Sequence, residues 1–280
     1  MNATRLGAKW TLVMMIACLM LLASAAWAEA PRTLMLATTT STDNTGLLDE
    51  LAPFFTKATG IELRWRATGT GNALELGKNC DVDVLLVHAP SAEKAYIANG
   101  YGIKRRQIMY NDFVIIGPQA DPAGIKGKPV VEALSQIAAK ASVFVSRDDN
   151  SGTNKKEIAL WQLTHLSKPD KQHWYVQAGQ GMLATINVAA ERMGYTLTDR
   201  GTYIKYAHVQ GGHPPLKVLV AGDPELRNQY SIVEVNPARC ANARNDLAHA
   251  FSQWMAGAEA QKRIGEFKLL DEALFIPNSK

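Results

Sequence analysis

The sequence lacks most of the patterns that would place it in a common class of protein. Its 3 cysteines and 6 histidines form no cluster with the spacing of a zinc site. Its 30 basic and 26 acidic residues nearly balance, which argues against the basic face of a nucleic-acid-binding protein. We find no internal repeat, no low-complexity linker and no segment with the polar bias of a long disordered region. The 280 residues therefore suit one large globular domain or two ordinary ones.

The motifs of several enzyme classes are missing as well. Segment 71–79 resembles a phosphate-binding P-loop, but five residues rather than four separate its glycines, and Asn79 stands where Ser or Thr is required. His208 and His213 flank a glycine pair without the helical spacing of metalloprotease ligands, which is typical of surface residues. The serine-nucleophile turn Gly-x-Ser-x-Gly does not occur. We therefore expect no enzyme, no cofactor and no metal ligands.

One long apolar run is present, at the N-terminus. Arg5 and Lys9 precede the uncharged run 10–26, and small residues at positions 26 and 28 follow the pattern of a signal-peptidase site. This order predicts a signal peptide over residues 1–28 and export to the periplasm, with a membrane anchor as the alternative. Cleavage would remove two basic residues and no acids, which lowers the net charge from +4 to +2.

Two cysteines, Cys80 and Cys240, remain after this cleavage. A pair in an oxidising compartment can form a disulfide. The sequence does not show whether their Cα atoms approach closely enough, so the bond stays a possibility.

Strands and helices alternate along the rest of the chain, which predicts an α/β fold with parallel strands, in two domains. We expect strands at 33–37, 61–66, 83–87, 113–116 and 143–145, and helices at 47–55, 72–78, 91–98, 130–140, 154–165 and 245–267. Pro53 is expected to kink or break the first helix. The chain is expected to cross between the domains near 111–112 and 231–233.

Three loops share one composition: each follows a strand, is rich in hydroxyl residues, and leads into a helix. They are Thr39–Ser41, Thr68–Gly71 and Arg147–Thr153. Free N–H groups and partial positive charge make a helix N-terminus a ready anion site, and ligands of open α/β sheets bind beyond the carboxyl ends of the strands. Helix capping is the better explanation of any one such loop. Three of them together favour anion binding.

Arg147 is the strongest single candidate. Its planar guanidinium matches two oxygens of an oxyanion, whereas the alternative is a surface ion pair with Asp148 or Asp149. Hydrogen bonds to a charged partner contribute about 1.5–3 kcal/mol each. About seven such donors offer a gross ~10–20 kcal/mol, which brackets the ~12 kcal/mol that nanomolar binding requires, so no metal ion is needed.

These loops belong to a set of stretches that resembles a known family, the periplasmic tungstate-binding proteins of tungstate-type ABC importers. The stretches are Ala37–Ser41, Thr68–Gly77, Asp83–Pro90, Met109–Phe113, Ser146–Thr153, Ala178–Met182 and Tyr195–Thr202. The resemblance implies a two-lobed type II periplasmic binding protein fold, in which each lobe is a mixed, mostly parallel sheet flanked by helices and the ligand lies in the cleft. Residues 31–112 and 232–280 would form lobe 1, and residues 113–231 would form lobe 2.

The same resemblance implies the ligand-binding residues. Lobe 1 would contribute Thr39, Thr40, Ser41 and Thr70, and lobe 2 would contribute Arg147, Ser151, Gly152 and Thr153. The expected function is capture of tungstate, with molybdate as a second ligand, by a monomer that delivers it to the permease of an ABC importer. The sequence does not separate the two anions.

Three alternatives remain open. The Arg147–Thr153 loop also resembles the motif of phosphate-binding proteins, in which the aspartate accepts a proton from hydrogen phosphate. Tungstate has no proton to offer, so in a tungstate site Asp149 should turn away from the ligand and orient Arg147. An enzyme acting on phosphoryl or sulfuryl esters would require a nucleophile beside a base, or a metal cluster. An oxyanion sensor would show the same sequence features as a transport protein.

Overall fold

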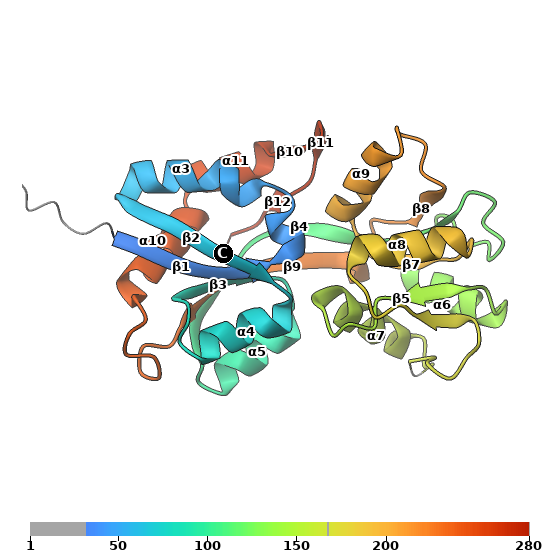
Figure 1. The fold of residues 1–280 in the computed structure, drawn as a ribbon, viewed down its shortest axis with the longest axis horizontal. Helices are drawn as coiled ribbons and strands as arrows, with labels where there is room; N and C mark the ends of the chain where they lie inside the picture. The colour runs from blue at the N-terminus through green and yellow to red at the C-terminus, as the bar shows by residue number, and fades with distance from the viewer. Residues whose placement is uncertain (1–31, 167, 280) are drawn as a thin grey trace, which may run out of the picture. The chain divides into compact units, whose positions relative to one another are not determined.

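The computed structural model describes residues 32–166 and 168–279, so the predicted signal peptide lies outside the described residues (Figure 1). The strands are β1 (Arg32–Thr39), β2 (Ile61–Thr68), β3 (Val84–Val87), β4 (Gly102–Pro118), β5 (Phe144–Ser146), β6 (Tyr175–Gln177), β7 (Thr196–Asp199), β8 (Leu216–Val220), β9 (Arg227–Val235), β10 (Lys268–Leu269), β11 (Glu272–Ala273) and β12 (Ile276–Pro277). The helices are α2 (Thr40–Asp43), α3 (Leu47–Thr59), α4 (Thr70–Lys78), α5 (Pro90–Ala98), α6 (Val130–Ala139), α7 (Gly152–Leu163), α8 (Met182–Glu191), α9 (Arg200–Val209), the 3-10 turn η1 (Pro224–Leu226), α10 (Asn245–Ala256) and α11 (Ala258–Glu266).

The main sheet has the strand order β12-β4-β9-β3-β1-β2. Strands β1 and β3 are parallel, whereas β9 is antiparallel to both β3 and β4. The parallel pairing of β5 and β6 forms a small second sheet. The main sheet is mixed, as the family resemblance implies, but it is not mostly parallel, because β4 and β9 form antiparallel pairs with their neighbours.

Strand β4 passes from one part of the sheet to another (Figure 1). Up to Asp112 it pairs with β9, and from Phe113 onward it pairs with β7, with β8 along its last residues. The sequence predicts only residues 113–116 of this strand, because residues 104–107 are Lys, Arg, Arg and Gln and lack an apolar alternation. Pairing on both sides of β4 supplies the order that the local pattern lacks.

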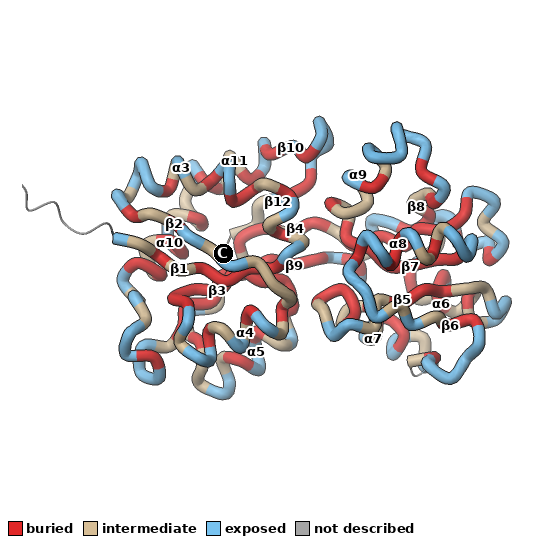
Figure 2. Tube along the Cα trace, viewed as in Figure 1, coloured by how far each residue is buried: buried red, intermediate tan, exposed pale blue. Residues whose placement is uncertain are grey.

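Buried side chains form separate cores on either side of this passage. The largest cluster includes Leu34, Phe55, Ile232 and Phe251, and a second one includes Phe113, Phe144, Trp161 and Tyr195. The two parts of the molecule are called the terminal half and the central half. The terminal half comprises β1–β3, α2–α5, α10, α11 and β10–β12, and the central half comprises α6–α9 and β5–β8. Figure 2 shows buried strands inside both halves and exposure on the outer helices.

Three local expectations need correction. Helix α3 continues through Pro53 to Thr59 instead of breaking, because Leu47, Leu48, Leu51 and Phe55 anchor it in the core. The predicted helix 245–267 is two helices, α10 and α11, which meet at the extended residue Gly257. Helix α4 begins at Thr70, two residues earlier than predicted.

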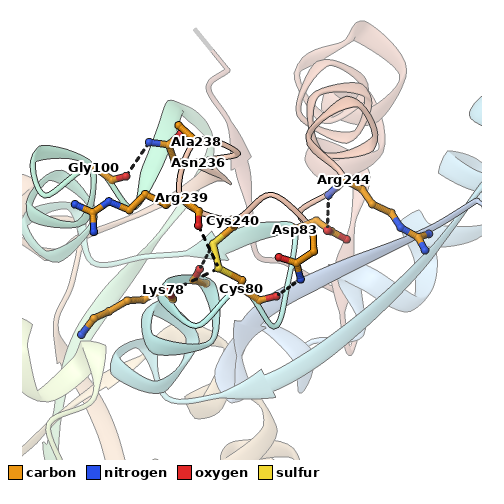
Figure 3. The surroundings of a disulfide bond; sticks show 11 residues. Lys78, Cys80, Asp83, Gly100, Asn236, Ala238, Arg239, Cys240 and Arg244 are labelled. Carbon is orange, nitrogen blue, oxygen red and sulfur yellow. Dashed lines mark hydrogen bonds between the residues drawn. A yellow bond between two sulfur atoms is a disulfide. The ribbon is translucent and has the colours of Figure 1, made fainter.

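The disulfide that the sequence left open is present in the terminal half. Cys80 and Cys240 are bonded with a Cα–Cα distance of 5.3 Å and a sequence separation of 160 residues (Figure 3). Asp83 lies beside the bond and accepts hydrogen bonds from the backbone N–H groups of Met35 and Arg244, each at 2.8 Å. The bond therefore joins the end of α4 to the segment that leads into α10.

Residues 32–166 and 168–279 lack both a membrane-spanning helix and a metal-binding cluster. No helix there is long and apolar enough to cross a membrane. No group of three or more His, Cys, Asp or Glu side chains there is arranged to hold a metal ion.

Candidate functional site

The first predicted loop forms a network of hydroxyl groups at the end of β1. Thr39 is the N-cap of α2, and its Oγ1 accepts a hydrogen bond from the backbone N–H of Thr42 at 3.2 Å. The same oxygen lies 2.7 Å from the hydroxyl of Thr42 and 3.1 Å from that of Ser41. Thr39 is therefore both the cap of α2 and the centre of a network of hydroxyl groups.

Thr70 and Gly152 bring the two halves into contact. Thr70 begins α4 in the terminal half, and Gly152 begins α7 in the central half. A Cβ atom added at Gly152 would lie 3.1 Å from Oγ1 of Thr70 and 3.3 Å from Cε1 of His88. Oγ1 of Thr70 is buried and has no hydrogen-bond partner among the described residues. A buried hydroxyl without a partner at two adjacent helix N-termini is suited to a polar ligand.

Arg147 is held by its neighbour Asp149. Its Nε and Nη2 atoms donate to Oδ2 of Asp149 at 3.1 and 2.5 Å, while Oδ1 of Asp149 accepts from the backbone N–H of Ser151 at 3.2 Å. Partial burial acts to raise the pKa of Asp149, but the hydrogen bonds from Ser151 and the charge of Arg147 outweigh it and lower the pKa. Asp149 is therefore ionised and turned toward Arg147, as the tungstate interpretation requires.

The ion pair does not leave Arg147 on the open surface. Its side chain is 13% exposed, and within the described part of the chain Nη1 donates no hydrogen bond. It lines a cavity of about 250 Å³ together with residues of both halves. The other lining residues are Thr40, Ser41, Asn44, Gly181, Met182, Leu183, Ala184 and Thr202. Pockets for drug-sized ligands occupy roughly 300–1,000 Å³, so this cavity suits a small ligand.

A buried cluster supports the Arg147 loop from behind. The Ser146 hydroxyl donates to Glu157 at 2.5 Å and accepts from the backbone N–H of Asp148 at 3.2 Å. Tyr175 and Trp161 also donate to Glu157, at 2.6 and 3.1 Å. Burial raises the pKa of Glu157. These contacts fix the start of the loop, which keeps Arg147 at the cavity.

Sequence reasoning missed His88, which follows β3 directly. Its side chain is buried, and Nε2 lies 3.0 Å from Oγ1 of Thr39 and 3.3 Å from Oγ of Ser41. Nδ1 lies 2.9 Å from Oδ1 of Asn228 on β9, and the ring stacks on Tyr230 at 4.8 Å. The available signal was its position at the carboxyl end of a fully buried strand, where site residues gather.

The starts of α8 and α9 were also missed, although both stretches carry the family resemblance. Gly181 precedes α8, and Thr202 lies in the first turn of α9. Asp199 caps α9 by accepting from the N–H and the hydroxyl of Thr202, at 2.9 and 2.7 Å. Lys205, one turn further on, donates to the backbone carbonyl of Asn44 in the other half. The N-terminal turns of α4, α7, α8 and α9 thus contribute to this region.

The structure groups most of the predicted residues. Thr40, Ser41 and Arg147 line one cavity, Thr39 is bonded to Ser41, and Thr70 adjoins Gly152. Two of the predicted residues, Ser151 and Thr153, do not line this cavity. The Ser151 hydroxyl caps α7 by accepting from the N–H of Asn154 at 3.2 Å, and Thr153 is buried in the first turn of the same helix. Ser151 thus caps the helix, as the capping interpretation of this loop expects, and its predicted contact with the ligand stays a prediction.

Comparison with known proteins places this geometry in context. A model of the PBP superfamily domain matches residues 24–259. The chain is 45% identical over 240 residues to the tungstate-binding protein TupA of Campylobacter jejuni, covering 86% of this chain and 89% of that protein. It is 43% identical over 256 residues to the TupA of Peptoclostridium acidaminophilum, covering 90% and 87%.

Solved structures give the same result. The tungstate-binding protein TupA from Desulfovibrio alaskensis has 64% sequence identity and a TM-score of 0.83, over 89% of this chain and 100% of that one. The tungstate ABC transporter protein from Geobacter sulfurreducens has 44% identity and a TM-score of 0.75, over 85% and 100%. Both likenesses extend over nearly all of the described chain.

Proposed function

The chain belongs to the PBP superfamily and, within it, to the family of the tungstate-binding proteins TupA, and we propose that it captures tungstate for an ABC importer. One observation carries the proposal beyond family membership. Arg147 from the central half and the hydroxyl-bearing Thr40 and Ser41 from the terminal half line one small cavity. A tetrahedral dianion offers only acceptors, and this cavity presents hydroxyl and guanidinium donors.

The proposed ligand set is the predicted one, with different roles for its members. Arg147 supplies the positive charge, and the hydroxyls of Thr39, Thr40, Ser41 and Thr70 face it from the terminal half. Gly152 and Thr153 offer the free N–H groups of the first turn of α7. Ser151 acts mainly through its cap, which holds that turn in place.

Asp149 favours tungstate over hydrogen phosphate as the ligand. A protonated oxyanion needs a free carboxylate to accept its proton. Both oxygens of Asp149 are engaged within the loop, one by Arg147 and one by the N–H of Ser151. The lowered pKa keeps the carboxyl group charged, so it would repel a dianion if it faced the ligand.

We propose that the two halves are the lobes of the binding protein. The change of β4 partners between Asp112 and Phe113 supports the first predicted crossing. Arg227 pairs with Asp112, which moves the proposed second crossing from 231–233 to the start of β9. Ligand would stabilise a closed arrangement, because only that arrangement brings the donors of both lobes together.

The proposed cellular context follows from the N-terminal segment. A signal peptide over residues 1–28 would send the mature chain to the periplasm, where the Cys80–Cys240 disulfide is stable. There it would act as a monomer that presents tungstate to the importer permease.

Calorimetric titration with tungstate, molybdate, phosphate and sulfate tests the proposal. We expect tight binding of tungstate, and weak or no binding of phosphate and sulfate. The competition between tungstate and molybdate then decides the selectivity between two anions of nearly equal size and charge. Tight phosphate binding without heat from tungstate would overturn the assignment.

A further inference from the structure

The hydrogen bonds of His88 fix which of its ring nitrogens can titrate. The amide nitrogen of Asn228 donates to Asn111 at 2.8 Å and to the hydroxyl of Tyr230 at 3.2 Å. Its amide oxygen therefore faces Nδ1 of His88 at 2.9 Å, and this acceptor requires a proton on Nδ1. Nε2 is consequently the nitrogen that is bare in the neutral ring and gains the second proton.

Nε2 competes with an anion for hydroxyl hydrogens. It lies 3.0 Å from Oγ1 of Thr39 and 3.3 Å from Oγ of Ser41. A neutral ring accepts a hydrogen from one of these hydroxyls, and a hydroxyl has only one hydrogen to give. A protonated ring donates from Nε2 instead, so that neither hydroxyl gives its hydrogen to the ring and that hydrogen can turn toward the ligand.

We infer that His88 takes up a proton when tungstate binds, and that it is thereby a positioning residue that turns the hydroxyls of Thr39 and Ser41 toward the anion. The inference rests on the proposed function. Its balance is simple: one proton leaves the solvent and forms the Nε2–H bond, and no other bond breaks. Binding of the dianion is then linked to pH through a group that does not itself touch the ligand.

The charged groups around His88 are consistent with a ring that is neutral before tungstate binds and protonated afterwards. Burial lowers the pKa of His88, opposed by the negative charge of Asp199 and assisted by the positive charge of Arg147. Tyr230, stacked on the ring, has a raised pKa because of burial and stays neutral. The other contacting residues, Thr39, Ser41, Asn228 and Gly152, carry no charge. His88 is thus neutral in the empty protein near pH 7, and a dianion nearby stabilises its protonated form.

The sign of the pH dependence follows from linkage. The complex holds more protons than the free protein at every pH between the free and bound pKa values of His88. Affinity therefore falls as the pH rises through this window, by up to about tenfold per pH unit. At pH values below the free pKa or above the bound pKa, the protonation of His88 no longer makes the affinity depend on pH.

Calorimetry of the disulfide-bonded mature protein measures the proton directly. Sodium tungstate is titrated at several values between pH 6.5 and 9 in two buffers of different ionisation enthalpy. We expect the observed heats to differ by an amount that corresponds to uptake of up to one proton per tungstate. Equal heats in both buffers over the whole range would overturn the inference. Absence of any tungstate binding would instead remove the proposed function on which it rests.

Matched variants assign the proton to His88. His88→Gln keeps an amide near Nε2 but cannot take up a proton, and His208→Gln changes an exposed histidine on α9. We expect the pH slope and the buffer dependence to vanish in His88→Gln and to persist in His208→Gln. A wild-type slope in folded His88→Gln contradicts the inference. Should that variant not fold, the ring signals of His88 in wild-type NMR spectra decide, because they must move to the protonated position on adding tungstate.

Discussion

The two halves supply opposite kinds of chemistry to one cavity. The terminal half lines the cavity with the neutral residues Thr40, Ser41 and Asn44. Behind that lining it holds the buried hydroxyls of Thr39 and Thr70, which are 4% and 1% exposed. The central half contributes a charge, Arg147, on a loop in which Asp148 and Asn150 adopt positive φ. The terminal half thus provides neutral hydroxyl groups, and the central half provides the positive charge of Arg147. We expect this charge to supply most of the attraction for an anion.

Loss of the disulfide should produce the largest effect, because only the terminal half contains this bond. In the chain-entropy model a closed loop of this length stabilises by about 5 kcal/mol. We expect Cys80→Ser with Cys240→Ser to lower the free energy of unfolding by about that amount in urea titrations. Hydrogen exchange should accelerate around α4 and α10 more than around α6. Equal acceleration in both halves would show that they unfold as one unit.

Removal of the charge tests the contribution of the central half. Arg147→Ala should weaken tungstate binding by at least about 3 kcal/mol, because it deletes charge-assisted hydrogen bonds. Arg147→Lys should cost less and reduce selectivity, because a point charge lacks the fork geometry. Arg192→Ala, at an exposed position of the same half, is the control and should bind as wild type. Unchanged affinity in Arg147→Ala would mean that the anion binds elsewhere.

Gly152 tests the contact between the halves. An added Cβ would press on Thr70 and His88 at 3.1 and 3.3 Å, so Gly152→Ala should resist closure and weaken tungstate binding by about tenfold, or ~1.4 kcal/mol. Gly71→Ala is the matched control, because its Cβ would meet only the end of Lys155 at 4.0 Å. Equal tungstate affinities of the two variants would show that the contact between Gly152 and Thr70 does not contribute to binding.

The smallest expected effect concerns the cap of α7. Ser151→Ala removes the acceptor for the N–H of Asn154 and should lower the free energy of unfolding by about 1 kcal/mol. Ser151→Asn, with another good capping side chain, should restore most of it. Thermal unfolding of the two variants gives the comparison. A large loss of tungstate affinity with unchanged stability would instead assign Ser151 a direct role in binding.

Much of the site was predictable because its residues lie at the ends of recognisable strands. The predicted strands 33–37, 83–87 and 143–145 correspond to β1, β3 and β5, and the loops after them carry Thr39, His88 and Arg147. His88 was missed because only its position after a buried strand marked it, and its contacts with Thr39 and Asn228 appear only in the fold. The starts of α8 and α9 were missed because Gly181 and Thr202 look like ordinary turn and helix residues.

The fold was predictable in its class and less so in its connections. The 17 residues of β4 could not be recognised, because its polar first part is ordered by pairing with β9 rather than by its own pattern. Pro53 gave a misleading signal, because burial of the surrounding leucines and Phe55 outweighs the ~3 kcal/mol cost of a proline inside a helix.

The sequence by itself determined which groups are available: an arginine in the loop after a buried strand, runs of hydroxyl residues before helices, and two cysteines for an oxidising compartment. Those properties are local, since they depend on residue type and on neighbours along the chain. Only the tertiary structure decided that Thr70 meets Gly152, that Asp149 turns to Arg147, and that His88 faces Thr39. Such contacts depend on how distant segments pack, and no local pattern encodes the distance between two strands' ends.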